Sequence, residues 1–228
     1  MNALSPNMPP LPPRLAGLPI DERGFPVPYF TLYINGKPDH RAMDMVKHDI
    51  CRRNGLCWVC GKTLPRGDKF FLVGPVGAMN GISREPPGHR ECMDYAARAC
   101  PHLRNPRAKR RPINVPEGSD AFILEEKAIL RNPGVIMLVE TDEYRTKVTP
   151  SGGAIFSYTH EDVKSYEVYS GGGVTTDMGL LEESYHATRD EIYKGMCSPA
   201  ELARYDQEVA VFLVRMSFKW RGREGGIV

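Results

Sequence analysis

The sequence predicts an α+β fold in two parts, and two observations lead to this prediction. First, cysteine and histidine side chains in the first half form two matched pairs, next to one strand-like and one helix-like stretch. Second, the other half alternates short apolar stretches with glycines and then ends in a well-marked helix. With 228 residues, of which 41% are hydrophobic, the chain is long enough to bury a sizeable core.

The first half is expected to begin with extended chain and to continue with a strand and a helix. Residues 1–28 contain eight prolines, which favour a polyproline-like conformation. The aromatic and β-branched run 28–34 predicts a strand, and the Asn-Gly pair after it predicts a tight turn. Apolar residues at near-helical spacing predict a helix over residues 39–54, which Gly55 would cap.

Two pairs of potential metal ligands follow this helix. Two residues separate Cys57 from Cys60 and His89 from Cys92, and 28 residues lie between the pairs. Three thiolates and one imidazole at this spacing are typical of a structural zinc site. Gly61 permits the positive φ that a Cys-x2-Cys turn uses.

The elements around the two pairs indicate how they would meet. A strand is predicted at residues 69–73 and a short helix from residue 89 to about 99, so the second pair would lie in the first helical turn. A metal-binding turn, a strand and two ligands at the start of a helix resemble the treble-clef arrangement. We therefore expect a treble-clef-like module with one Zn²⁺ per chain. Four protein ligands leave no open position for water, so the zinc is predicted to be structural.

The second half is expected to form a small antiparallel sheet with packed helices. Strands are predicted at residues 135–141, 154–158 and 163–169, as a meander punctuated by glycines. A helix is predicted over residues 177–194. The last helix is the most clearly marked, because a Ser-Pro-Ala-Glu string from Ser198 combines an N-cap, a first-turn proline and a capping box.

Charge is distributed unevenly along the chain. Residues 1–114 carry 18 basic and 9 acidic side chains, whereas residues 115–228 carry 12 basic and 19 acidic ones. Five cations fall within eight positions directly after the predicted zinc helix, and guanidinium groups suit phosphate contacts. This basic run favours nucleic-acid binding; a solvated linker, or docking on the acidic second half, is the competing interpretation. Its members are Arg104, Arg107, Lys109, Arg110 and Arg111.

The predicted organisation has four segments, and whether the two folded ones share a core is left open. The chain has no run of about 18 apolar residues and no signal-peptide pattern, so we expect no membrane helix and a cytoplasmic location. The segments are a Pro-rich extended segment (1–28), a zinc-binding module (29–103), a basic linker (104–116) and an α+β C-terminal domain (117–228).

Several strings in and after the zinc region look like a known family. They are L-C-W-V-C-G at 56–61, E-P-P-x-H-R-x-C at 85–92 and A-A-R-A-C-P at 96–101. They resemble a family of uncharacterised proteins of bacteria and their phages, over roughly residues 24–195. The resemblance implies a shared zinc domain and a bacterial or phage setting, with the host cytoplasm as the location if the chain is phage-encoded. It implies no activity.

Three functions follow as hypotheses. The leading one is a non-enzymatic structural-zinc protein that binds nucleic acid or a nucleic-acid-handling complex. The second is a protein-interaction or inhibitor module that acts on a host protein. The third is a metal-dependent nuclease of the HNH type. That pattern is poorly matched, because the stretch between the ligand pairs contains Asn80 but no histidine, whereas His40, His48 and His102 lie outside it.

Overall fold

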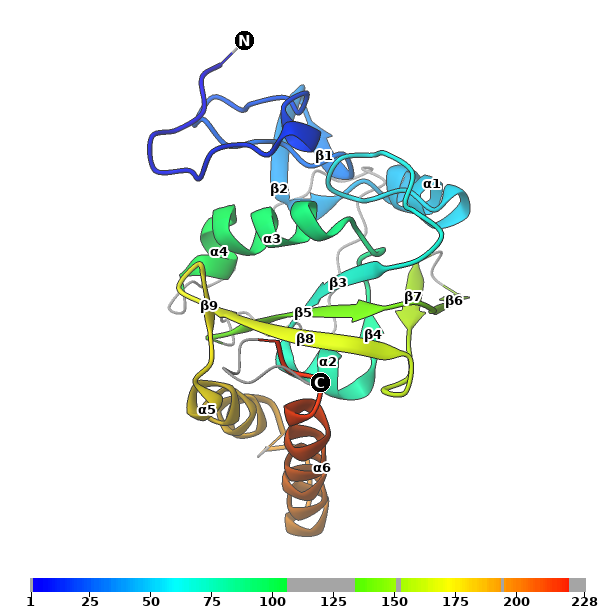
Figure 1. Cartoon of the computed structure of the whole chain (residues 1–228), viewed down its shortest axis with the longest axis vertical. Helices are drawn as coiled ribbons and strands as arrows, with labels where there is room; N and C mark the ends of the chain where they lie inside the picture. Colours follow the sequence, from blue (N-terminus) through cyan, green and yellow to red (C-terminus); the bar gives the residue numbers. More distant parts are fainter. Residues whose placement is uncertain (1, 106–133, 151–152, 194, 222–228) are drawn as a thin grey trace.

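The computed structural model describes residues 2–105, 134–150, 153–193 and 195–221, and it confirms a mixture of helices and antiparallel sheet. A four-stranded antiparallel sheet in the order β3-β5-β8-β9 crosses the middle of the molecule, with helices on both sides (Figure 1). Its strands are Lys69–Val73 (β3), Ile136–Thr141 (β5), Val163–Ser170 (β8) and Gly173–Thr175 (β9).

Each face of this sheet packs against a hydrophobic core. Successive side chains of a strand point to opposite faces, so neighbouring residues belong to different cores. On one face Phe71, Val139 and Tyr166 stand opposite one another and join a core built with three helices. On the other face Phe70 and its neighbours join a second core, built with α3 (Arg90–Ala99). The helices of the first core are α2 (Pro75–Asn80), α5 (Met178–Thr188) and α6 (Pro199–Ser217).

The pairing of β3 with β5 joins the two halves of the chain. β3 precedes α3 in the first half, β5 lies in the second half, and five residue pairs connect them in antiparallel register. The ranges predicted as a zinc-binding module and a C-terminal domain therefore contribute strands to one sheet and side chains to both cores.

The prediction of a helix over residues 39–54 is wrong for its first residues. Residues 37–43 form a strand, because the turn at residues 35–36, where both φ angles are positive, closes a hairpin with the preceding strand. The side chain of Asp44 then accepts hydrogen bonds from two first-turn amides and starts the helix, which Gly55 ends in the left-handed conformation as predicted. These elements are β1 (Thr31–Ile34), β2 (Lys37–Met43) and α1 (Met45–Asn54).

The strand predicted at residues 154–158 is present but does not belong to a meander with its neighbours. It forms β7 (Ala154–Ser157) in a separate three-stranded sheet, ordered β4-β7-β6. Its partners, β4 (Ile82–Ser83) and β6 (Arg145–Val148), were not predicted, and neither were α2 and β9.

The last two helices follow the prediction closely. α5 ends at Thr188 and gives way to a π-helical turn at Arg189–Tyr193. α6 begins with the predicted capping box, in which the side chains of Ser198 and Glu201 exchange hydrogen bonds with each other's backbone amides. No helix among the described residues is long and apolar enough to cross a membrane.

The Pro-rich segment packs on α3. A short 3-10 turn at Pro13–Leu15 places Leu15, which is fully buried, in the second core. Arg14 forms an ion pair with Glu91 of α3. The hydroxyl of Tyr95, also on α3, donates a hydrogen bond to the carbonyl of Pro9 (3.3 Å). The segment therefore covers the same helix that carries two of the predicted metal ligands.

We expect Leu15→Ala to lower the free energy of unfolding by about 2–4 kcal/mol, because it leaves a cavity in the second core. Urea unfolding of the purified protein measures this change. The matched control is Leu180→Ala on α5, whose side chain is 37% exposed and which should cost much less. Equal effects of the two substitutions would contradict the packing of the N-terminal segment.

Candidate metal centre

The first pair of ligands lies in a tight turn, residues 57–61, which we call the metal knuckle. The backbone amide of Gly61 donates to the carbonyl of Cys57 (2.8 Å), and the amide of Cys57 donates to the carbonyl of Lys62 (2.9 Å). Gly61 has φ of 68°, and a Cβ there would lie 2.7 Å from the ring of Tyr29. Glycine is therefore required both by the backbone conformation and by the close approach of that ring.

The second pair is presented by the start of α3. His89 is the residue before the helix, in extended conformation, and Cys92 lies in the first turn, where its amide donates to the carbonyl of His89 (3.0 Å). Gly88 pairs with Phe70 of β3, and a Cβ on Gly88 would lie 3.2 Å from the sulfur of Cys57. The absence of a side chain at Gly88 thus lets the knuckle, β3 and α3 meet.

The four ligand atoms converge as the spacing predicts. All lie within 4.8 Å of one another; Nδ1 of His89 is 3.4 Å from Sγ of Cys60 and 3.8 Å from Sγ of Cys92. A tetrahedral zinc ion with bonds of about 2.1–2.3 Å would place its ligands about 3.6–3.8 Å apart. Cys57 and Cys92 are fully buried. The cluster can therefore hold one metal ion in a closed site.

A hydrogen bond to the backbone orients the imidazole for this task. Nε2 of His89 lies 3.1 Å from the carbonyl oxygen of Thr63, which can only accept, so Nε2 carries the proton. The lone pair of Nδ1 is then free to face the three sulfurs, as a metal ligand requires. Arg14 approaches the same Nε2 to 3.5 Å, but its charge is paired with Glu91.

The three thiols perturb one another because they are so close. Hydrogen bonds from the thiols of Cys57 and Cys92 lower the pKa of Cys60, so the first negative charge forms there. The hydrogen bonds of Cys92 with Cys57 and Cys60, together with burial, raise the pKa of Cys92 far above its usual range. Three thiolates in this space would repel one another strongly, and a divalent cation removes that repulsion.

The remaining cysteines lie outside the cluster and form no disulfide. Burial, with the nearby charges of Cys57 and Cys60, raises the pKa of Cys51 to about 12, so it is a neutral thiol. Cys100 and Cys197 are half-buried.

The histidines outside the cluster have contacts of their own and, among the described residues, do not join a group that could hold a metal ion. His40 contacts Asp21 (3.2 Å), and Nε2 of His48 donates to the carbonyl of Arg84 (2.9 Å). His102 lies in α4 (Pro101–Arg104). Within the described ranges, the only group of three or more potential ligands that could hold a metal is the cluster of three cysteines and His89.

Only the first residue of the predicted basic run is described. Arg104 ends α4 and donates a hydrogen bond to the carbonyl of Asn7 in the N-terminal segment (3.1 Å). Arg107, Lys109, Arg110 and Arg111 lie outside the described residues.

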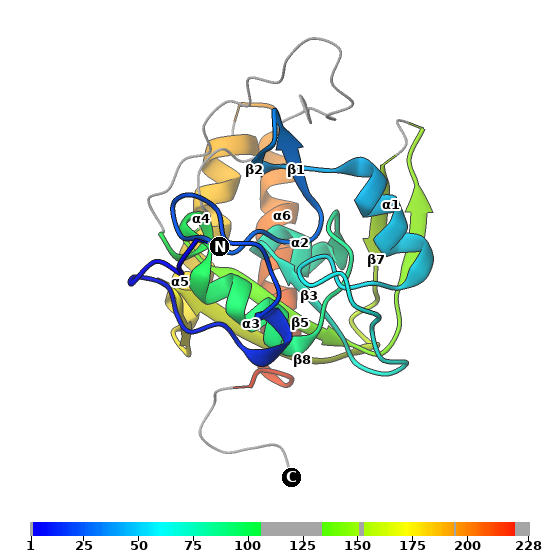
Figure 2. The same cartoon turned by 90° about the horizontal axis from the view of Figure 1, so that it is seen from above.

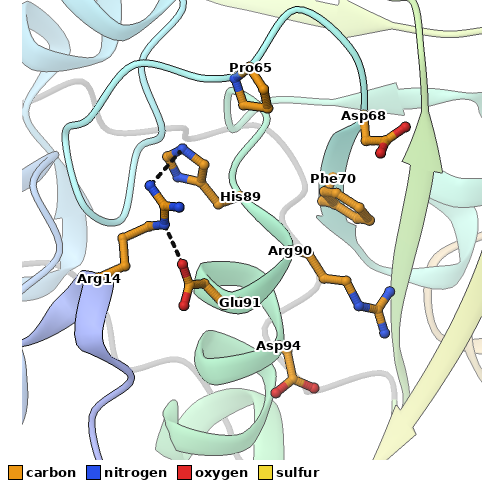
Figure 3. A pocket seen from close by; sticks show the side chains of 8 residues that line it. All are labelled: Arg14, Pro65, Asp68, Phe70, His89, Arg90, Glu91 and Asp94. Atoms are coloured by element: carbon orange, nitrogen blue, oxygen red, sulfur yellow. Dashed lines mark hydrogen bonds and ion pairs between the residues drawn. The ribbon is translucent and has the colours of Figure 1, made fainter.

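An open hollow of about 580 Å³ lies beside the metal cluster (Figure 3). The ring of His89 and the Arg14–Glu91 ion pair form one side, and Arg90 points away from them on the other. Arg90 pairs with Glu167 of β8, so both cations of the hollow are already neutralised. The remaining lining residues are Pro65, Asp68, Phe70 and Asp94.

A polar network that the sequence did not predict fastens α3 to the sheet. The hydroxyl of Tyr169 on β8 contacts carboxylate oxygens of Asp94 (2.7 Å) and Glu167 (3.0 Å). Arg98 binds Asp94, and Arg90 binds Glu167. Burial and the bond with Asp94 raise the pKa of Tyr169, so the hydroxyl keeps its single proton. Only the spacing of Asp94 and Arg98, one helical turn apart, signalled part of this network in advance.

No family model, curated protein or solved structure matches the chain. Evidence for its function therefore comes from the site itself.

We expect Cys57→Ser and Cys92→Ser each to abolish metal binding and to lower the free energy of unfolding by more than about 4 kcal/mol, because a structural metal contributes directly to folding. Elemental analysis of purified protein should give about one zinc ion per unmodified chain. The control, Cys197→Ser, replaces a thiol outside the cluster and should keep both the metal and the stability. If both Cys57→Ser and Cys92→Ser keep the metal, then other residues bind it.

Proposed function

We propose that this chain is a non-enzymatic binding protein built on one structural zinc ion in a treble-clef-like arrangement. The observation that carries the proposal is the convergence of four buried or half-buried donors, three sulfurs and one imidazole, of the kind that zinc prefers. Knuckle, β3 and α3 follow one another in the order of that arrangement. We further propose that the chain belongs to the bacterial and phage family that its zinc-region strings resemble, and acts in the bacterial or host cytoplasm.

Two features support a role in binding instead of catalysis. Four protein ligands saturate a tetrahedral ion, which leaves no position for a reacting water or substrate. The two arginines that line the adjacent hollow also form ion pairs within the protein, Arg14 with Glu91 and Arg90 with Glu167.

The proposed partner is nucleic acid, bound in part through the basic run 104–111. The run starts at the end of α4, one short helix after the metal-binding α3, so a rigid element positions its first residue. It has no acidic member, and its guanidinium groups can form paired hydrogen bonds with phosphates. Binding of this kind releases counterions and must weaken steeply as salt rises.

We expect the chain to bind a labelled 20-nucleotide strand, with affinity that falls by orders of magnitude between 50 and 200 mM salt. Changing Arg107, Lys109, Arg110 and Arg111 together to Gln should reduce the slope of log affinity against log salt by about 3. Fluorescence anisotropy over a salt series measures both quantities.

The matched control removes four exposed cations that already pair with carboxylates. It should change the slope little, since those charges are locally neutralised. A wild-type protein that binds neither single strands nor duplex at 50 mM salt would refute the nucleic-acid proposal while leaving the zinc proposal intact. The control positions are Lys37, Arg41, Arg53 and Arg204.

One observation favours protein interaction as a second candidate. Val211, Val214 and Phe218 are 46%, 61% and 69% exposed, and their spacing places them on one side of α6 and its C-cap. Exposed apolar side chains grouped in this way are typical of protein contacts. If a protein partner co-purifies with the chain in a fixed ratio, we expect Phe218→Ser to abolish that co-purification without altering thermal unfolding. A partner that still co-purifies with this variant would exclude the surface formed by Val211, Val214 and Phe218 as its binding site.

A further inference from the structure

The outward face of the second sheet carries three cations. β7, the central strand of the sheet β4-β7-β6, lies at one side of the molecule next to α1 (Figure 2). One of its faces is buried: Phe156 is fully buried, and its ring contacts His48 of α1. The opposite face therefore points away from the protein.

The strand register shows which side chains share that outward face. Ile82, Ser157 and Arg145 stand opposite one another across the three strands, and Lys147 stands opposite Ile155. Because side chains alternate along a strand, both sets lie on the face opposite Phe156. Arg84 comes directly after β4, and the sequence exposed–buried–exposed over residues 82–84 places it on the same side.

The positions are close enough for one ligand to touch all three cations. Residues two apart on a strand are about 6.6 Å apart and neighbouring strands are about 4.8 Å apart. The backbone positions of Arg84, Arg145 and Lys147 therefore fall within about 12 Å of one another. Ile155 lies between Arg84 and Lys147 across the sheet, and Ile82 lies two residues before Arg84 on the same face; both side chains are partly exposed.

These cations differ from most others on the surface because they have no acidic partner. Arg84, Arg145 and Lys147 are exposed and form no ion pair with any residue in the described part of the chain. By contrast, the exposed Arg53 and Arg204 pair with carboxylates on their own helices. Three uncompensated positive charges on one flat face attract a polyanion.

We propose that this face, formed by Arg84, Arg145, Lys147, Ile82 and Ile155, binds the backbone of single-stranded nucleic acid. The cations complement consecutive phosphates, and the two isoleucines offer apolar contact to unstacked bases. A duplex keeps the faces of its bases stacked inside and shows only base edges in its grooves, so it offers the isoleucines less apolar surface than a single strand does. Contacts to phosphates, and apolar contacts to the faces of bases, carry no direct sequence information, so we expect recognition to be independent of sequence.

A purely protective role does not account for this arrangement. β6 is an edge strand, and cations on an edge strand discourage pairing with other chains. Arg84 follows β4, the opposite edge strand, which has only two residues and so offers little backbone for another chain to pair with. Edge protection therefore accounts for Arg145 and Lys147 but not for a cation beside so short a strand.

The proposal rests on the proposed nucleic-acid function and adds a second set of residues, none of which belongs to the basic run 104–111. The two surfaces can therefore be tested independently. The test variant changes Arg84, Arg145 and Lys147 to Gln, and the charge-matched control changes Lys37, Arg53 and Arg204 to Gln.

Anisotropy with a 20-nucleotide single strand, its duplex and polyglutamate at several salt concentrations gives the required comparison. We expect the triple variant to lose about tenfold in single-strand affinity at 100 mM salt and about 2 in the salt slope, whereas the control loses neither. Duplex binding should change less than single-strand binding. Circular dichroism and thermal unfolding should be unchanged in both variants, since all six side chains are on the surface.

Each other outcome is informative. If the wild-type chain binds no nucleic acid, the proposed function and this surface both fail. If binding is lost only in the basic-run variant while the triple variant binds normally, the function stands and the sheet face is refuted. Loss of polyglutamate binding alone would assign the face to an acidic protein partner, and aggregation of the triple variant with unchanged affinity would assign it to edge protection; either result overturns the proposal.

Discussion

The orientation of α3 is the constraint on which the first half of the structure depends. The cluster of Cys57, Cys60, His89 and Cys92 ties the start of this helix to the metal knuckle. The helix has a layer on each side: the sheet, through the second core, and the N-terminal segment, through Leu15 and Arg14. Removing the ligand cluster would therefore loosen both layers at once, because α3 is the element they share.

Polar contacts fasten the same helix along its length. Tyr169 places one proton between Asp94 and Glu167, and two arginines balance the carboxylates. Such a partly buried network is stable only when all its members are present, since a lone carboxylate at this depth would be costly. The ligand cluster thus holds the start of the helix, and the charged network holds its body. Apolar side chains of the helix pack in the second core between these contacts.

Sequence alone was sufficient where a local pattern determines the structure. The spacing within each ligand pair, the glycine after Asn54 and the capping box at Ser198 each depend on residues within a few positions; the structure brings the two pairs together and confirms the glycine cap and the capping box. It was insufficient where partners are distant. β4 has only two residues, and β7 left the expected meander because its pairing with β4 joins residues more than 70 positions apart. The hydrogen bond from His89 to the carbonyl of Thr63 likewise had no local signal, and the contacts of Tyr169 had none beyond the spacing of Asp94 and Arg98.

The pairing of β3 with β5 has a consequence for the order in which the chain folds. Sixty-three residues separate Val73 from Met137, the pair in that register that is closest in sequence. The knuckle and α3, in contrast, are complete within a stretch of about 40 residues. Loop-closure entropy favours the shorter connection, and long-range strand pairing is intrinsically slow. During synthesis the ligand cluster can therefore assemble first. Until β5 leaves the ribosome, β3 lacks the partner strand that it has in the described part of the chain, and its apolar side chains stay exposed.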